Sequence, residues 1–230
     1  ALRQADLPLA TALGRVSRPA SFVVSPAAAD PVRPKLALYP DLRLKLMASP
    51  DWDDTSLEDL AATGAVDVVD LKGQYAPELP VAVRPEPALY RRVLRAFPDA
   101  WIEDPGETAA TTPILDGHRH RITWDAPIRS AADIARRSPP CGMINMKPSR
   151  FGSLQAFLDA HDFCERRAIR TYTGGQFELG PGRRQVQLLA SLFSPDAPND
   201  VAPTAFNEPV LRPGLPSNRL PACPLTPGFR

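Results

Sequence analysis

The fold of this chain is decided by one stretch, Ala100-Trp101-Ile102-Glu103-Asp104-Pro105-Gly106-Glu107. Its first three residues are apolar and predict the end of a buried strand. The strand ends on two adjacent carboxylates, Glu103 and Asp104, because the proline and glycine that follow cannot continue a sheet ladder. A carboxylate at such a position needs a cation, hydrogen-bond donors or water around it. A single strand end of this kind is ordinary, so its meaning depends on whether other strands end in the same way.

The same pattern recurs on neighbouring strands. Residues 66–70 and 121–125 are β-rich runs that each end on an acid, and residues 142–147 form a run that ends on a lysine. If the strands are parallel, their carboxyl ends lie at one rim, so carboxylates from three successive strands face one another. Such carboxylates repel, and a hard divalent cation such as Mg²⁺ relieves the repulsion. The three strand-end acids are Asp70, Glu103 and Asp125.

Strands and helices alternate along most of the chain. Further β-rich runs occupy residues 21–25, 42–47 and 169–173, and a short last strand ends near Asp200. Units of strand and helix, each of roughly 20 to 35 residues, imply parallel strands joined by right-handed crossovers. About eight such units predict an α/β fold of the TIM type, a closed (β/α) barrel. An open doubly wound sheet is the alternative, but no glycine-rich turn follows the first strand.

Composition narrows the classes of function. The 230 residues are 43% hydrophobic and 23% charged, which is enough for one large domain with a buried core. The net charge is +1 and no basic stripe is present, so we expect no nucleic-acid partner. No apolar run reaches the ~18 residues of a membrane span, and the first residues lack a signal-peptide pattern. The chain begins with Ala1 inside a helical pattern, so we expect it to be a segment of a longer protein or a processed one.

The cysteines are too few and too scattered for a structural scaffold. Cys141, Cys164 and Cys223 form no C-x-x-C pair, so neither a disulfide framework nor a zinc site is indicated. We expect all three to be unpaired thiols. Unpaired thiols fit a reducing compartment and predict a cytoplasmic location.

Taken in order, the motifs resemble those of the enolase superfamily, and more closely its muconate-lactonizing and o-succinylbenzoate synthase-like branch. The matching stretches are Arg43-Leu44-Lys45, Val69-Asp70-Leu71-Lys72, Trp101-Ile102-Glu103-Asp104-Pro105, Trp124-Asp125, Asn145-Met146-Lys147-Pro148-Ser149-Arg150-Phe151-Gly152 and Gly175-Gln176-Phe177-Glu178-Leu179-Gly180. The resemblance extends to about Pro203 and covers nearly the whole chain. It implies a modified barrel whose N-terminal capping domain is absent from this segment. Residues 1–205 are then the catalytic barrel, and residues 206–230 are a proline-rich tail that packs on the barrel or on the missing cap domain.

The resemblance also implies an activity. Members of the superfamily are Mg²⁺-dependent lyases and isomerases that remove the proton alpha to a substrate carboxylate and stabilise the resulting enediolate on the metal. By resemblance, Asp70, Glu103 and Asp125 bind Mg²⁺, with Mn²⁺ as an alternative ion. Lys45 and Lys147 are the expected acid–base pair, on strands that lie across the barrel from each other. The expected partner is a small carboxylate substrate, and the sequence is compatible with a homo-oligomer.

Several positions depart from the pattern of the family. Arg43 replaces a lysine and cannot serve as a base, but it can hold a carboxylate. Lys72 replaces an asparagine and is expected to pair with the rim acids, and Ala126 replaces an acid. Asn145 is expected to contact the substrate or to support residues that do, while for Glu178 a structural partnership with an arginine is equally open. These departures leave a second hypothesis, an altered enolase-like scaffold that has lost the activity.

Overall fold

A parallel sheet forms the centre of the fold. The computed structural model describes residues 1–26, 32–137, 142–178, 180–208 and 210–229. Its main sheet has six strands in sequential order, each parallel to the next. These strands are β2 (Leu44–Met47), β3 (Val66–Asp70), β4 (Trp101–Glu103), β5 (Ile122–Trp124), β6 (Met143–Met146) and β7 (Arg170–Thr173). Sequential parallel order follows from the alternation of strands and helices, since each helix returns the chain to the same end of the sheet.

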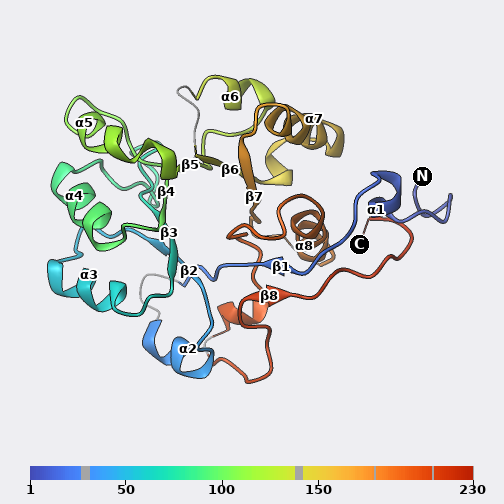
Figure 1. Cartoon of the computed structure of the whole chain (residues 1–230), viewed down its shortest axis with the longest axis horizontal. Coiled ribbons are helices and arrows are strands. Elements are labelled where there is room, and N and C mark those ends of the chain that lie inside the picture. The colour runs from blue at the N-terminus through green and yellow to red at the C-terminus, as the bar shows by residue number, and fades with distance from the viewer. Residues whose placement is uncertain (27–31, 138–141, 179, 209, 230) are drawn as a thin grey trace.

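The sheet curls around an axis, with helices on its outer side (Figure 1). Isolated bridges extend from both of its edges: Val24 bridges Leu44 of β2, and Asp200 bridges Gly174 after β7. A third bridge, between Phe22 and Asn199, joins the two short segments that carry these residues. All three bridges are parallel, so the segments around residues 22–24 and 199–200 run in the same direction as the six strands.

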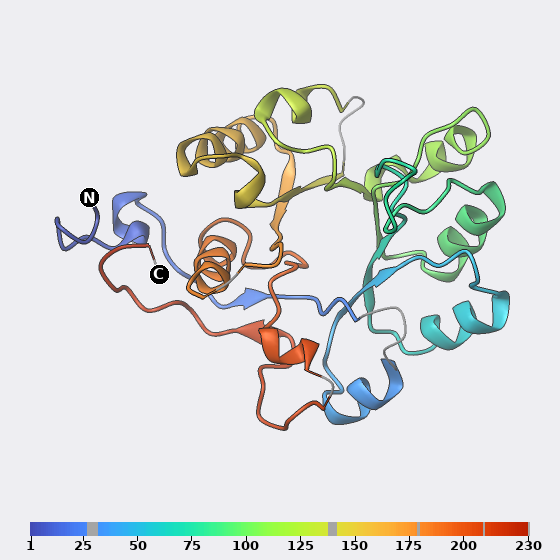
Figure 2. The ribbon, with the colours of Figure 1, turned by 180° about the vertical axis from the view of Figure 1, so that it is seen from behind.

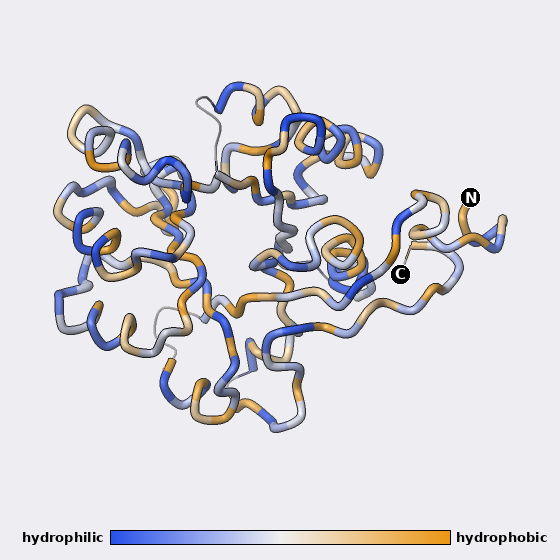
Figure 3. The backbone as a smooth tube through the Cα atoms, viewed as in Figure 1, coloured by the Kyte–Doolittle hydropathy of each residue, from blue (hydrophilic) through white to orange (hydrophobic). Residues whose placement is uncertain are grey.

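Most of the helices alternate with the strands and pack on the outside of the sheet, while the first helix precedes every strand. The helices are α1 (Leu9–Ala12), α2 (Val32–Leu38), α3 (Asp54–Ala61), α4 (Pro87–Ala96), α5 (Thr112–Leu115), α6 (Ala131–Ala135), α7 (Leu154–Glu165) and α8 (Gly182–Phe193). Short 3-10 turns occupy Asp116–Arg121, Pro148–Arg150 and Thr204–Asn207. Within the described residues, every helix is too short or too polar to cross a lipid bilayer. In Figure 3 several helices carry both apolar and polar stretches, as expected where only one face of a helix is buried.

Local sequence sets several of the helix starts. Asp53, Ser130 and Ser153 each accept a hydrogen bond from the backbone N–H three residues later, which caps the first turns of α3, α6 and α7. Pro87 begins α4 at a position where a backbone N–H has no helical partner anyway. Each of these signals lies in the sequence within a few residues of the helix that it starts.

The core lies between the strands and the surrounding helices. Leu89 and Val93 of α4 and Phe157 of α7 are fully buried in the larger apolar cluster. A smaller cluster joins Phe22 and Tyr39 to Phe206 near the C-terminus, so residues just beyond position 205 also contribute to packing.

The two ends of the chain show features that the sequence patterns do not predict. The spacing of Leu2, Leu9 and Leu13 predicts one helix, but the helix is limited to Leu9–Ala12, since Pro8 starts it and Asp6 adopts a left-handed φ of 51°. The predicted parallel sheet is confirmed for β2 to β7, and a separate two-stranded sheet pairs β1 (Ala20–Ser21) antiparallel with β8 (Arg219–Leu220) from the tail. Figure 2 shows this pair beside α8, away from the curled sheet. Strands of two residues carry no periodicity, so the sequence offered no signal for this pairing.

Two of the three cysteines lie in the described part of the chain. Cys164 is buried and Cys223 is half-buried, and no disulfide joins these two residues. The third cysteine, Cys141, lies outside the described residues.

His161 in α7 predicts a pH dependence of stability. Its side chain is 1% exposed and stacks on Phe193 with ring centroids 4.3 Å apart. Burial, and after it the charge of Arg15, lowers the pKa of His161 to about 3. An unfolded histidine titrates near pH 6.5, so below that pH the unfolded chain binds a proton that the native chain does not. Stability contributed by neutral His161 is therefore present above about pH 6.5 and is lost as the pH falls toward 3.

We expect wild type to lose about 2 kcal/mol of unfolding free energy through His161 alone between pH 7 and pH 5. Urea unfolding of wild type and His161→Leu at both pH values measures this contribution as the difference between the two losses. Equal losses in the two proteins would show that His161 does not couple folding to pH.

Candidate metal centre at the carboxyl ends of the strands

Buried acids converge at one end of the sheet. Asp70 and Glu103 are the last residues of β3 and β4 and stand opposite each other in the strand register. Both are fully buried, as is Asp104, which follows at once with a left-handed φ of 49°. One carboxylate oxygen from each of the three lies within 4.8 Å of the others. The structure thus brings together two of the three acids chosen from the sequence, with Asp104 in place of Asp125.

Asp104 holds the neighbouring loop in place. Its two carboxylate oxygens accept hydrogen bonds from the backbone N–H groups of Asp125 and Ala126, each at 2.8 Å. Burial, together with the charges of Asp70 and Asp125, raises the pKa of Asp104 to about 7. Because these bonds fix the backbone after β5, Asp104 determines where the Asp125 carboxylate lies. The sequence analysis noted Asp104 only as a second acid beside Glu103.

The carboxylate of Asp125 is paired with cationic side chains. Lys147 Nζ lies 3.1 Å from its Oδ2, and Arg150 Nη1 lies 2.8 Å from its Oδ1. Burial acts to raise the pKa of Asp125, but Lys147 and Lys45 outweigh it and hold this pKa below its usual value. Asp125 therefore stays ionised beside the other acids, although it is not among the three with the closest oxygens.

Two more lysines, Lys45 and Lys72, form ion pairs with the rim acids. Lys45 Nζ is 2.5 Å from Glu103 Oε1, 3.3 Å from Asp200 Oδ2 and 3.9 Å from Asp70 Oδ2. Lys72 Nζ is 2.6 Å from Asp70 Oδ2, which agrees with the predicted pairing of Lys72 with a rim acid. Burial acts to lower the pKa of Lys45, but the negative charges of Glu103 and Asp200 outweigh burial. The pKa of Lys45 is therefore well above its usual value.

Three further residues at this rim were missed by the sequence analysis. The hydroxyl of Tyr172, which is buried on β7, donates a hydrogen bond to Glu103. Arg150 forms an ion pair with Asp125, and Asp200 forms one with Lys45. A tyrosine or an arginine gives no signal of its own in a strand or loop. Asp200 carried a signal, since it ends the last predicted strand as the other acids end theirs.

The donor set suits a hard divalent cation. Five acids gather at this rim, and counted as ionised they carry one more charge than the four cations that form ion pairs with them: Asp70, Glu103, Asp104, Asp125 and Asp200 against Lys45, Lys72, Lys147 and Arg150. Burial raises the pKa of Glu103 well above its usual value, so the protein alone solvates this carboxylate poorly. Asp70 Oδ2 is buried and makes no hydrogen bond among the described residues, and its charge is met by the ammonium groups of Lys72 at 2.6 Å and Lys45 at 3.9 Å. Oxygen ligands of this kind are those that Mg²⁺ prefers.

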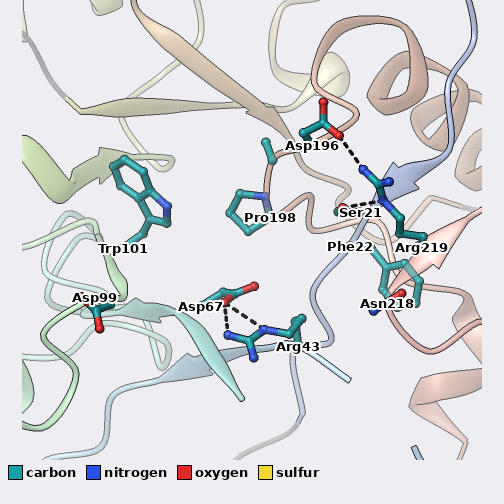
Figure 4. Close-up of a pocket in the computed structure, with 11 residues that line it drawn as sticks. Ser21, Phe22, Arg43, Asp67, Asp99, Trp101, Asp196, Pro198, Asn218 and Arg219 are labelled. Atoms are coloured by element: carbon teal, nitrogen blue, oxygen red, sulfur yellow. Dashed lines mark hydrogen bonds and ion pairs between the residues drawn. The ribbon is translucent and has the colours of Figure 1, made fainter. Parts of the chain in front are cut away.

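Arg43 lies away from this rim, so the predicted role at the substrate site is wrong. Its guanidinium binds the Asp67 carboxylate, with Nε 3.0 Å from Oδ1, and its Nη1 donates to the carbonyl of Gly64 at 2.8 Å. Figure 4 shows Arg43 and Asp67 lining a cavity of about 350 Å³ together with Trp101. Arg43 precedes β2, Asp67 is the second residue of β3 and Trp101 is the first residue of β4, so the cavity lies toward the end of the sheet opposite to Asp70 and Glu103, which end β3 and β4.

Asn145 and Glu178 have different environments. Asn145 is fully buried and neither atom of its amide has a hydrogen-bond partner among the described residues. A Cβ on Gly174 would lie 2.3 Å from Asn145 Oδ1 and 2.8 Å from Lys147 Cε, so glycine is required for this close approach. Glu178 accepts from the backbone N–H of Gln176 and lies 3.7 Å from Arg183, which favours the structural partnership.

The chain is similar in sequence to two curated proteins. The chain is 34% identical over 110 residues to an o-succinylbenzoate synthase of Bacillus subtilis, which covers 43% of the chain and 29% of that protein. It is 30% identical over 178 residues to an o-succinylbenzoate synthase of Enterococcus faecalis, which covers 70% of the chain and 44% of that protein. The chain therefore spans less than half the length of these curated relatives.

Solved structures share the fold. A dipeptide epimerase from Methylococcus capsulatus, complexed with Mg and the dipeptide L-Arg-D-Lys, superposes with a TM-score of 0.72 at 24% identity, covering 99% of this chain and 68% of that one. Muconate lactonizing enzyme superposes with a TM-score of 0.69 at 18% identity, covering 99% of this chain and 67% of that one. Fold and relatives together place the chain in the muconate-lactonizing and o-succinylbenzoate synthase branch of the enolase superfamily. Residues 16–208 match the family described as "Domain of unknown function (DUF8230) C-terminal domain", and the chain belongs to this family.

Proposed function

We propose that this chain is the (β/α) barrel domain of a Mg²⁺-dependent lyase or isomerase that abstracts the proton alpha to a substrate carboxylate. One observation carries the proposal: buried acids on successive strand ends lie together, with Lys45 paired to Glu103 and Lys147 paired to Asp125. The relatives support it, since they are lyases and isomerases of one superfamily, and one neighbour is complexed with Mg and a dipeptide. Residues 1–205 would form the barrel and residues 206–230 a tail, with a capping domain outside this segment.

We assign the metal ligands to Asp70, Glu103 and Asp125. Both oxygens of Asp104 already bind backbone N–H groups, which suits it to orienting the third ligand. Asp125 is held by the side chains of Lys147 and Arg150, which can move aside. Once bound, Mg²⁺, or Mn²⁺ in its place, would supply positive charge to the substrate carboxylate as its α-proton leaves.

The proton itself is moved by the chain's own lysines. Lys147 directly follows β6, and Lys45 lies within β2. The two lysines therefore come from different strands, and they pair with different acids, Asp125 and Glu103. One lysine takes the α-proton, and the other returns a proton or supports the developing charge as a cation. Asn145, with an unpartnered amide beside Lys147, is placed to contact the substrate. We further propose a small carboxylate substrate and a cytoplasmic location.

A second candidate rests on the ion pairs. Asp70, Glu103 and Asp125 each already have a cationic partner, so the same rim could be a metal-free scaffold held together by salt bridges. Exchange of α-protons with solvent separates the two candidates. The full-length protein is incubated in D₂O with a panel of carboxylic acids and dipeptides, with MgCl₂ or with EDTA, and deuterium at the α-carbon is followed by NMR. The enzyme proposal expects exchange only with Mg²⁺, while absence of exchange across the panel would favour the scaffold.

A further inference from the structure

Lys45 is a buried cation shared among three carboxylates. Its side chain is 6% exposed, and its Nζ lies 2.5 Å from Glu103, 3.3 Å from Asp200 and 3.9 Å from Asp70. Because water reaches it so little, its charge has to be balanced by a neighbouring carboxylate. The shortest of the three contacts is to Glu103, one of the proposed ligands of the metal.

A divalent cation at the rim would compete with Lys45. Asp70 and Glu103 both belong to the close group of oxygens that suits a metal, whereas Asp200 does not. A divalent cation bound to Glu103 would repel the ammonium of Lys45, which lies 2.5 Å from the same carboxylate. A buried ammonium that lost its partners without replacement would be strongly destabilising. Binding of the ion therefore requires another carboxylate that can receive the ammonium of Lys45.

Asp200 is held in the position that this role requires. Its backbone N–H donates to Thr173 O and its carbonyl accepts from Gly175 N–H, both at 3.0 Å, so its backbone is fixed to the end of β7. Its Oδ1 accepts from the Ser25 hydroxyl at 3.3 Å, and its Oδ2 faces Lys45. With 21% of its side chain exposed, Asp200 lies at the edge of the cluster rather than among the fully buried acids.

Resting on the proposed Mg²⁺ site, we propose that Asp200 is a positioning residue that receives the ammonium of Lys45 when Mg²⁺ takes Glu103. Metal binding is then coupled to a movement of one side chain, from a buried carboxylate to a partly exposed one. Asp200 contributes no ligand to the ion. It stabilises the metal-loaded state through Lys45 alone.

A double-mutant cycle tests this coupling without any substrate. MgCl₂ is titrated calorimetrically into the metal-free chain for wild type, Asp200→Asn, Lys45→Met and the double variant. We expect Asp200→Asn to weaken Mg²⁺ binding at least about fivefold, the lower end of typical coupling between sites. In the Lys45→Met background the same change is expected to alter the dissociation constant less than about twofold, since no ammonium needs a new partner.

Two further variants control for charge and folding. Asp196→Asn removes an acid that pairs with Arg18 and Arg219, outside the cluster of rim acids, and is expected to leave Mg²⁺ affinity unchanged. Ser25→Ala removes only the hydroxyl that holds Asp200 and is expected to weaken binding in the same direction by a smaller factor. Unfolding midpoints of all variants establish that each is folded during the titration.

The outcomes are distinct. An equal loss of affinity from Asp200→Asn in both backgrounds would show that Asp200 acts on the ion directly, which overturns the proposal. Unchanged affinity in Asp200→Asn, with wild type binding Mg²⁺, overturns it as well and leaves the proposed function standing. Failure of wild type to bind Mg²⁺ at all would instead remove the metal site on which both proposals rest.

Discussion

Lys147→Ala is expected to abolish Mg²⁺-dependent exchange of the substrate's α-proton with solvent while Mg²⁺ still binds. Lys147 is 8% exposed, and its Nζ lies 3.1 Å from the proposed ligand Asp125, so this ammonium can reach the substrate face of the site without being a ligand. Loss of a general acid–base group lowers a rate by about 10²- to 10⁴-fold. The measurement is deuterium incorporation at the α-carbon of whichever carboxylate the full-length protein exchanges, beside a calorimetric titration of MgCl₂.

Lys147→Arg is the matched control for charge. Arginine keeps the ion pair with Asp125 but stays protonated, so it cannot take a proton from carbon. Both variants should lose exchange, and Lys147→Arg should retain the Mg²⁺ affinity and the unfolding midpoint of wild type more closely than Lys147→Ala does. Exchange at the wild-type rate in Lys147→Arg would refute the assignment of Lys147 as the base on that face of the substrate, even with the fold unchanged.

Glu103→Gln is expected to have opposite effects with and without metal. Burial raises the pKa of Glu103 well above its usual value, so its ionised form opposes folding at neutral pH. The amide has nearly the same shape and removes a charge from a buried group of acids, and Lys45 keeps Asp200 as a carboxylate partner at 3.3 Å. Without metal, the unfolding midpoint of the variant should therefore be equal to or higher than that of wild type.

With Mg²⁺ the order should reverse. Ligand present at about 100 times its dissociation constant stabilises the state that binds it by about 2.7 kcal/mol. Wild type should gain this stabilisation and Glu103→Gln should not, because it lacks a charged ligand of the ion. Thermal unfolding with EDTA and with MgCl₂ measures both effects. A variant that gains as much as wild type from Mg²⁺ would exclude Glu103 as a ligand.

Much of the fold could be predicted because its signals are local. The strand at Val66–Asp70 and the strand before Glu103 are apolar runs that end on acids, and both end there in the structure. Asp53 and Ser130 cap α3 and α6, and an N-cap is a signal of local sequence. Since all strands of the main sheet run in the same direction, the strand ends identified in the sequence are neighbours in space.

The parts that could not be predicted depend on position along a strand and on contacts between segments far apart in the sequence. Arg43, just before β2, and Lys45 within it are on the same face of the alternating pattern, but two residues along a strand span about 6.6 Å. That distance puts Lys45 among the rim acids and Arg43 beside Asp67 instead. The bond from Tyr172 to Glu103 joins residues far apart in sequence, and no local pattern encodes it.

The most direct test of the metal centre is a crystal structure of the protein grown with MgCl₂, with MnCl₂ as its anomalous substitute. The account predicts one ion at the carboxyl ends of the strands, bound by oxygens of Asp70, Glu103 and Asp125 at about 2.0–2.1 Å for Mg²⁺. Lys45 should then lie on Asp200. Crystals at saturating MnCl₂ without an anomalous peak between these acids, and with Lys45 still on Glu103, would contradict it.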